Sequence, residues 1–415
     1  MLILTPSLEL LTPAVLASPR VRRNRRIWAL SLSALALVFA LVLTRGGNAH
    51  FATKKPHHRT THQRAVPPAG TDPRLAPGWD GDGKPVTFAF AGDVDFPAGS
   101  NLGQRLAADP ATALGPTVPE LLSGANLTMT NFESALSNDH CPDAQPKQYV
   151  FYAPSTAVQA FEGAGLTLVS EANNHGEDCG PPGLQTALAV RGQSGYPILG
   201  IGEDAAHAFA PYEATVNGEK IAIIAATQVI DSDLQTAWTA TAHQPGLASA
   251  YDLKDLVSAV ESARRVSDTV VVYLHWGTET NDCPNSLQEP LAKALVEAGA
   301  DIVVGTHAHV LLGGGYLGSA YVDYGLGNFA FYDNSPPEDE SGSLVITTTG
   351  RRIDSVTWRP AVIVDDLPEP LTGSAATAAI GSWNGARECT NVTATPTTPI
   401  ATPTTETSAA AQGAT

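Results

Sequence analysis

The sequence predicts an α/β domain with a partly parallel sheet between residues 85 and 359. The first observation is that short apolar runs alternate with segments of helical periodicity, a pattern typical of this class. The second is that five of these runs end in side chains of the kinds that bind metals. A chain of 415 residues accommodates one large domain with appendages, because single cores stop growing at roughly 250–300 residues.

Two helices of this domain are marked by their apolar positions and their end signals. The first spans residues 252–265 and has four apolar residues on one face: Leu253, Leu256, Val257 and Val260. The second follows Ser286, where SLQE matches a capping box before PLAKALVEAG. Gly299 is its expected stop, directly before the strand DIVVG.

The five apolar runs with polar ends are predicted strands. They are VTFAFAGD, ending at Asp93; NLTMTNFE, at Asn131 and Glu133; GLTLVSEANNH, at Asn173, Asn174 and His175; DTVVVYLHWG, with His275; and ADIVVGTHAH, at His307 and His309. Ligands of open α/β sheets bind beyond the carboxyl ends of the strands, so these ends are expected to converge on one crevice. Carboxylate, amide and imidazole groups together suit Zn²⁺, Mn²⁺ or Fe rather than Ca²⁺. Each motif alone is also ordinary turn or core chemistry, so the prediction depends on the five together.

The first 84 residues predict a membrane anchor and a linker. Residues 1–26 form a basic cytoplasmic segment, and residues 27–44 contain no charge, which makes them a transmembrane helix near the lower length limit of roughly 17–25 residues. The arginines before this helix place the amino terminus in the cytoplasm and the domain outside, in a single-pass protein of the cell membrane. The alternative is a cleaved signal peptide and secretion, with GNA at 47–49 near the cut. Residues 45–84 predict an extracytoplasmic linker rich in Pro, Gly, His and Thr.

The remaining chain divides into a domain at residues 85–365 and a C-terminal extension at 366–415. From Thr390 on, the extension has the Thr/Pro/Ala-rich composition of a disordered tail. The net charge is −17, and because the first 45 residues contribute +5, the rest of the chain carries −22. This acidity argues against nucleic acid as a partner. An anionic substrate would need local positive charge, such as a bound metal.

Four cysteines, Cys141, Cys179, Cys283 and Cys389, all follow the predicted membrane segment. Disulfides persist outside the cytoplasm, and the spacing fits no zinc ribbon, so two bridges with three possible connectivities are expected. Cys141 and Cys179 each lie a few residues beyond a motif of the proposed crevice. We therefore predict a Cys141–Cys179 bridge, which leaves Cys283 to pair with Cys389.

Six motifs resemble, in the same order, those of the CapA family of capsule and poly-γ-glutamate biosynthesis proteins. They are GDVDF, NFESALS, EANNHGEDCGPPGL, HWGTE, GADIVVGTHAHV and YGLGNFAF, and they cover roughly residues 85–333. The resemblance implies a calcineurin-like metallophosphoesterase fold. That fold is a four-layer α-β-β-α sandwich with a metal site at the strand ends.

The resemblance also implies roles for individual residues. The implied metal ligands are Asp93, Glu133, Asn174, His275, His307 and His309. Among them Glu133 stands at the position of the acidic bridge between two metals, so the implied cofactor is one or two divalent transition-metal ions, Mn, Fe or Zn. His175 resembles the histidine that acts on the leaving group, and Asp178 is a candidate partner that fixes its tautomer.

The sequence also departs from the superfamily pattern. Asp95 stands where phosphoesterases usually carry a histidine, NFE replaces an Asp-rich loop, and Phe96 and Pro97 replace a glycine and a basic residue. Cys179 stands where an aromatic residue is common. Two further residues are expected near the site: Glu279, as a supporting acid or a solvated side chain, and Asn328, as a hydrogen-bonding group.

Two classes of function are consistent with these motifs. The first is a metal-dependent hydrolase or transferase, in which metal-activated water attacks a phosphoester or a γ-glutamyl amide of an envelope polymer. The second is a non-catalytic polymer-binding component of an export or anchoring complex. The expected partners are an anionic envelope polymer or phosphoester substrate and membrane-bound polymer-synthase or export proteins.

Overall fold

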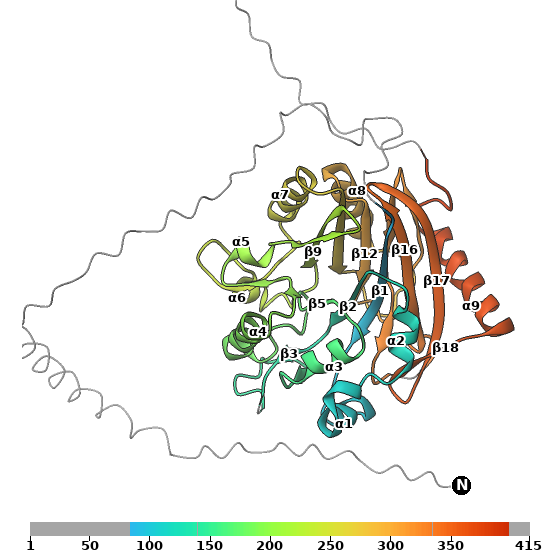
Figure 1. Ribbon diagram of the computed structural model, residues 1–415. Helices are drawn as coiled ribbons and strands as arrows, with labels where there is room; N and C mark the ends of the chain where they lie inside the picture. Colours follow the sequence, from blue (N-terminus) through green and yellow to red (C-terminus); the bar gives the residue numbers. More distant parts are fainter. Residues whose placement is uncertain (1–83, 139, 334, 398–415) are drawn as a thin grey trace, which may run out of the picture. The chain divides into compact units, whose positions relative to one another are not determined.

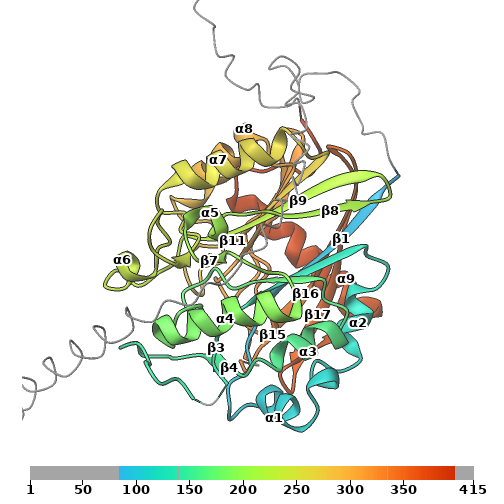
Figure 2. The same cartoon turned by 60° about the vertical axis from the view of Figure 1, so that its left-hand side comes forward.

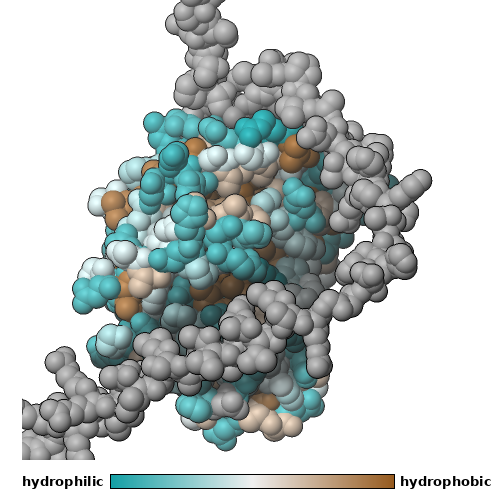
Figure 3. All heavy atoms as spheres, turned by 90° about the vertical axis from the view of Figure 1, so that its left-hand side faces the viewer, coloured by the Kyte–Doolittle hydropathy of each residue, from teal (hydrophilic) through white to brown (hydrophobic). Residues whose placement is uncertain are grey.

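The computed structural model describes residues 84–138, 140–333 and 335–397. The predicted cytoplasmic segment, the transmembrane helix at 27–44 and nearly all of the linker lie outside the described residues. Within the described ranges, no helix has the length and apolar character needed to cross a membrane. The face of the domain shown in Figure 3 is largely hydrophilic, with apolar residues in small patches.

The larger of two main sheets has eight strands. Their spatial order is β18 (Leu367–Pro370), β17 (Arg352–Val364), β16 (Glu340–Thr349), β1 (Val86–Val94), β2 (Leu127–Phe132), β5 (Leu168–Ser170) and β6 (Ile198–Leu199), with β15 (Asn328–Ala330) also paired to β1. Strands β1, β2, β5 and β6 run parallel, whereas β16, β17 and β18 add antiparallel neighbours. Next to Asp93 the register of β1 shifts against both β2 and β15, as is common beside functional sites.

The second main sheet has six strands. Their order is β13 (Gly314–Leu317), β14 (Ala320–Asp323), β12 (Ile302–Thr306), β11 (Thr269–His275), β9 (Glu219–Thr227) and β8 (Tyr212–Val216). The central four strands are parallel and both edge strands are antiparallel. Two small ribbons pair β3 (Ala135–Leu136) with β4 (Tyr152–Ala153), and β7 (Ile201–Gly202) with β10 (Gly246–Leu247).

The two sheets pack face to face and helices cover their outer faces, so the domain has four layers (Figures 1 and 2). Successive side chains of β1 point to opposite faces of the sheet. Phe88 and Phe90 therefore enter the core between the sheets, whereas Ala89 and Ala91 face helices. The helices against the larger sheet are α1 (Asn101–Ala108), α2 (Thr117–Leu122), α3 (Ala157–Gly163) and α4 (Gly180–Ser194). Those against the second sheet are α7 (Leu253–Arg264) and α8 (Gln288–Ala298). Shorter helices lie in connections: η2 (Pro110–Thr112), α5 (Ala205–Ala208) and α6 (Gln235–Trp238).

Both predicted helices are present, but one capping prediction was wrong. Helix α7 begins after Asp252, whose side chain accepts from the Lys254 amide at 3.0 Å. Ser286 does not cap α8. The side chain of Asn285 accepts from the Leu287 amide at 3.0 Å, and Gln288 Oε1 accepts from the Asn285 amide at 2.9 Å. The capping hydrogen bonds therefore begin at Asn285, one residue before the predicted Ser286. The side-chain amide of Asn285 takes the role that was expected of the serine hydroxyl.

Two disulfides join Cys141 to Cys179 and Cys283 to Cys389, which confirms the predicted pairing. The structure also adds elements to the domain beyond residue 365. Strand β18 extends the larger sheet, and α9 (Gly373–Gly385) stacks Trp383 on Trp358 of β17 with ring centroids 5.4 Å apart. Beyond α9 come η3 (Ala386–Cys389) and then Thr393, whose backbone pairs with Tyr316 of β13 although it lies in the predicted low-complexity tail.

The carboxyl group of Asp323, at the end of β14, predicts a pH-dependent stability. Burial raises the pKa of Asp323 to about 7, and in the unfolded chain the pKa is about 4. The folded state holds the proton more tightly, so this group stabilises the fold below about pH 4. That contribution is lost as the pH rises through about 7.

Asp323→Asn keeps an oxygen to accept from the Gly325 amide, which bonds Oδ1 at 3.1 Å. We expect the stability of the variant relative to the wild type to increase by on the order of 3 kcal/mol as the pH rises from 5 to 8. Urea unfolding at the two pH values measures this difference. Equal pH dependence of the two proteins would contradict it.

Candidate metal centre

The five predicted strand ends do meet, but they come from both sheets. Asp93 in β1, Glu133 after β2 and Asn174 after β5 belong to the larger sheet. His275 ends β11, and the turn carrying His307 and His309 follows β12, in the second sheet. The carboxyl ends of these strands open at the same side of the stacked sheets, so one site receives ligands from both.

Six side chains make a compact cluster at this position. The candidate ligand atoms of Glu133, His307 and His309 lie within 4.8 Å of one another, as do those of Asp93, Glu133 and His275. Glu133 belongs to both groups, and its Oε1 is 3.6 Å from Nε2 of His275 and 3.8 Å from Nε2 of His309. Asn174 joins the cluster through its Oδ1, 2.7 Å from Nε2 of His275.

These separations match a metal site. Neighbouring ligands with metal bonds of about 2.0–2.2 Å lie roughly 3.0–3.5 Å apart. The observed values of 2.7, 3.6 and 3.8 Å bracket that range, so small side-chain movements would bring the atoms onto one ion. The cluster can therefore hold a metal ion.

Burial makes the cluster costly without a cation. Both oxygens of Glu133 and Nδ1 of His307 lack a hydrogen-bond partner among the residues described. Burial raises the pKa of Asp93 and of Glu133, and the Asp93 carboxylate raises that of Glu133 further. Burial also lowers the pKa of His275 and of His307, which keeps their imidazoles in the neutral form that binds metals. A divalent cation would give these buried oxygen and nitrogen atoms a partner and compensate the carboxylate charge. The donor set therefore fits a transition metal.

Neighbouring polar groups fix the orientation of the candidate ligands. Asn131 Nδ2 donates to Asp93 Oδ1 at 2.8 Å, as expected from their opposed positions in β1 and β2. Nδ1 of His275 lies 3.0 Å from the Thr306 hydroxyl, its register partner in β12. Asn328, expected to hydrogen-bond near the site, holds Nδ1 of His309 at 2.8 Å.

The turn that carries the two histidines has strained backbone. His307 has φ 92° and His309 has φ 57°, both in the left-handed region that side-chain-bearing residues rarely occupy. The His307 amide donates to Asp93 Oδ2 at 3.1 Å, which ties the turn to β1. Such strain is typical of functional sites, where the surrounding structure maintains it.

His175 lies beside the cluster, with its Nδ1 2.5 Å from Asp178 Oδ2. Burial lowers the pKa of His175 and the Asp178 carboxylate opposes that effect. Asp178 also accepts from the Phe151 amide at 2.7 Å and from Lys147 Nζ at 2.7 Å. The Phe151 ring stacks on the His175 ring at 4.2 Å. Glu279, the other expected acid, is exposed to solvent.

Two of these neighbours, Lys147 and Phe151, were not predicted from the sequence. Both lie in the connection between β3 and β4, which has no strand or helix pattern. Lys147 Nζ also contacts the Asn174 carbonyl and lies 3.4 Å from Asp231 Oδ2. The one signal for this segment was Cys141, whose bridge to Cys179 brings it against Asp178.

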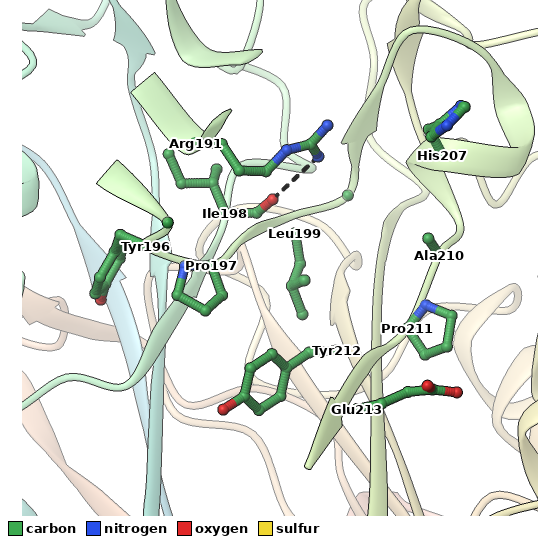
Figure 4. Close-up of a pocket in the computed structure, with 12 residues that line it drawn as sticks. Arg191, Tyr196, Pro197, Ile198, Leu199, His207, Ala210, Pro211, Tyr212 and Glu213 are labelled. Carbon is green, nitrogen blue, oxygen red and sulfur yellow. Dashed lines mark hydrogen bonds between the residues drawn. The ribbon is translucent and has the colours of Figure 1, made fainter. Parts of the chain in front are cut away.

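A separate cavity of about 420 Å³ lies between the edge strands of the two sheets (Figure 4). None of its lining residues is a candidate ligand. Its guanidinium group, from Arg191, donates to the carbonyls of Ile198 at 3.4 Å and Ile201 at 2.8 Å and so supports the chain locally. The candidate ligands lie at the strand ends instead.

Fold and site together define an α/β protein of two stacked sheets with a buried cluster of potential metal ligands. The family described as bacterial capsule synthesis protein PGA_cap matches residues 87–333. Because this match covers more than half of the chain, the protein belongs to that family.

Two curated relatives are similar in the same region. The capsule biosynthesis protein CapA of Bacillus anthracis is 32% identical over 228 residues, which cover 54% of this chain and 54% of the relative. The PGA biosynthesis protein CapA of Bacillus subtilis (strain 168) is 29% identical over 247 residues, covering 59% and 63%. The chain thus spans roughly half to two thirds of the length of these relatives.

Solved structures are more distantly similar. A hypothetical protein from Thermus thermophilus has 15% identity and a TM-score of 0.42, covering 69% of this chain and 100% of its own. A putative 5'-nucleotidase from Staphylococcus aureus has 14% identity and a TM-score of 0.41, covering 73% of this chain and 58% of its own. Similarities of this size carry no functional argument.

Proposed function

We propose that the protein is a metal-dependent hydrolase that acts in the biosynthesis of a cell-envelope polymer. Its substrate would be a phosphoester or a γ-glutamyl amide, and its domain would stand outside the cell membrane on the anchor at residues 27–44. The observation that carries the proposal is the buried Glu133 carboxylate with no hydrogen-bond partner among the described residues, surrounded by imidazoles. A structural role would have provided it with a donor.

Asp93, Glu133, Asn174, His275, His307 and His309 would hold one or two ions of Mn, Fe or Zn. A divalent metal bound there would supply Lewis acidity toward the scissile bond and an activated water. The protein's own contribution would be to orient these ligands through Asn131, Thr306 and Asn328. Such supporting bonds sharpen both the geometry and the affinity of a metal site.

His175 would move a proton to the leaving group. Asp178 binds Nδ1 and stabilises the protonated imidazole, so Nε2 is the nitrogen left to face the substrate. Lys147 and the Phe151 amide hold Asp178 in place on its other side. Phe151 covers the imidazole face and keeps water from it.

Hydrolysis of a generic phosphoester by the Mn²⁺-loaded full chain tests this function. We expect chelation to abolish the activity and added Mn²⁺ to restore it. His175→Gln should lower kcat by roughly 10²–10⁴-fold, since that is the usual contribution of a positioned acid, while metal affinity stays close to that of the wild type. Full activity in the chelated protein or in the variant would contradict the proposal.

A non-catalytic, polymer-binding role is the second candidate. Asp95, at a position where phosphoesterases usually have a histidine, is in neither ligand group, and its Oδ1 accepts from the Ser134 hydroxyl at 3.2 Å. A site with fewer ligands than the usual phosphoesterase site can bind a metal ion and yet be a poorer catalyst. Metal binding without turnover of phosphoesters or γ-glutamyl amides would favour this role.

A further inference from the structure

Four aromatic rings extend outward from the candidate metal centre and form what we call the aromatic rim: Tyr149, Phe151, Phe331 and Tyr332. Their centroids are spaced closely, with Phe151 6.3 Å from Tyr149 and 5.9 Å from Tyr332, and Phe331 5.1 Å from Tyr332. The rim touches the centre at two points. Phe151 stacks on His175 at 4.2 Å, and Phe331 lies 5.1 Å from the His309 ring.

Exposure rises from the base of the rim to its edge. Phe331 is buried with 3% of its surface exposed, whereas Tyr332 is 39% and Tyr149 is 56% exposed. Exposed apolar rings gathered beside a site, rather than scattered over a surface, mark a place where a ligand packs. The rim therefore continues the metal centre outward as an aromatic surface.

The rim is built on fixed backbone. The segment that carries Tyr149 and Phe151 is joined by Cys141 to Cys179, and its Gln145 amide donates to the Asp178 carbonyl at 2.9 Å. Phe331 follows β15, which pairs with β1 next to Asp93. A preformed surface of this kind loses little conformational entropy when a ligand binds.

The charges beneath the rim do not favour an extended polyanion. Lys147, the cation next to His175, is already engaged by Asp178 at 2.7 Å and Asp231 at 3.4 Å, and it lies over the Trp238 ring at 5.1 Å. The carboxylates of Asp93 and Glu133 below would be compensated by the divalent metal that they hold in the proposed function. The rim thus presents aromatic ring faces to a ligand, together with the Tyr149 hydroxyl at its solvent-exposed edge. The positive charge of Lys147 next to it is compensated by carboxylates.

We propose that the aromatic rim binds a pyranose ring as the leaving alcohol of a sugar phosphoester. This rests on the proposed hydrolase function, because His175, which would protonate the leaving oxygen, is the residue on which Phe151 stacks. In the reaction the phosphorus–oxygen bond to the sugar breaks, water oxygen bonds to phosphorus, and the sugar oxygen takes a proton. Aromatic faces pack against the C–H face of a sugar, and the tyrosine hydroxyl can bond its hydroxyl groups.

Glucose 6-phosphate and sorbitol 6-phosphate test the proposal, because they share the phosphate and the carbon chain but only the first has a ring. With the full Mn²⁺-loaded chain, we expect kcat/KM to be at least about 10-fold higher for glucose 6-phosphate. Tyr149→Ala and Tyr332→Ala should each reduce that ratio by roughly 3- to 10-fold. Tyr149→Phe, which keeps the ring, should retain most of it.

Two outcomes overturn the rim proposal while leaving the hydrolase intact: equal kcat/KM for the two compounds, or a preference for uridine 5'-monophosphate, which would indicate stacking of a base. If a generic phosphoester is hydrolysed but neither sugar compound is, the rim proposal also fails and the hydrolase stands. If no phosphoester is hydrolysed, the phosphoester form of the hydrolase proposal fails, and calorimetric titration of both compounds decides whether the rim binds a pyranose ring. Tighter binding of glucose 6-phosphate that is lost in Tyr149→Ala supports it. Equal or absent binding overturns it.

Discussion

Replacing His307 by alanine is expected to abolish metal binding while leaving the fold intact. The imidazole is 4% exposed, its Nδ1 has no hydrogen-bond partner in the part of the chain that is described, and its backbone is strained at φ 92°. Removing it deletes an unsatisfied polar atom, so the metal-free variant should be within about 1 kcal/mol of the wild type. With metal at 100 times its Kd, the wild type should gain about 2.7 kcal/mol of stability and the variant none.

Glu133→Gln and His207→Ala complete this experiment. Glutamine removes the charge of a buried carboxylate without partners, so we expect it to raise metal-free stability and to abolish metal binding. His207 is exposed and pairs with Asp204 away from the centre, so its loss should leave metal binding unchanged. If His307→Ala instead loses several kcal/mol without metal, and the wild type gains nothing from metal, the cluster is structural.

The strand ends could be predicted from the sequence because two local signals coincide there. Each apolar run is followed at once by carboxylate, amide or imidazole groups, and parallel strands expose such ends at one edge. What the runs do not encode is the partition into two sheets. β1 and β11 are equally apolar, and only packing assigns Phe90 and Tyr273 to opposite walls of the same core, 6.4 Å apart.

Lys147 and Phe151 could not be predicted for a different reason. They reach His175 through a connection whose course depends on tertiary contacts, including the Phe151 amide bond to Asp178 across 27 residues. Neither periodicity nor a motif marks such a segment. The same holds for Asn285, where the amide side chain took the capping role that the SLQE pattern assigned to Ser286.

Gly92 precedes the first candidate ligand, and its lack of a side chain allows β15 to approach β1. A Cβ atom at Gly92 would lie 1.9 Å from the Gly327 carbonyl oxygen and 2.9 Å from that of Leu326. The same Gly327 oxygen accepts from the Asp93 amide at 3.0 Å. Because both obstacles are backbone atoms of a buried strand connection, neither can move aside without shifting Asp93.

Gly92→Ala is therefore expected to destabilise the protein by about 3 kcal/mol or more and to weaken metal binding at the same time, since Asp93 and its partner Asn328 would separate. Gly192→Ala is the matched control. It lies exposed in α4, where a Cβ would meet nothing within 4 Å, so the same substitution should stabilise the helix by up to roughly 1 kcal/mol. Urea unfolding and metal titration of both variants measure the contrast. A Gly92→Ala protein as stable and as metal-competent as the wild type would show that the close approach of β15 to β1 is not what positions Asp93.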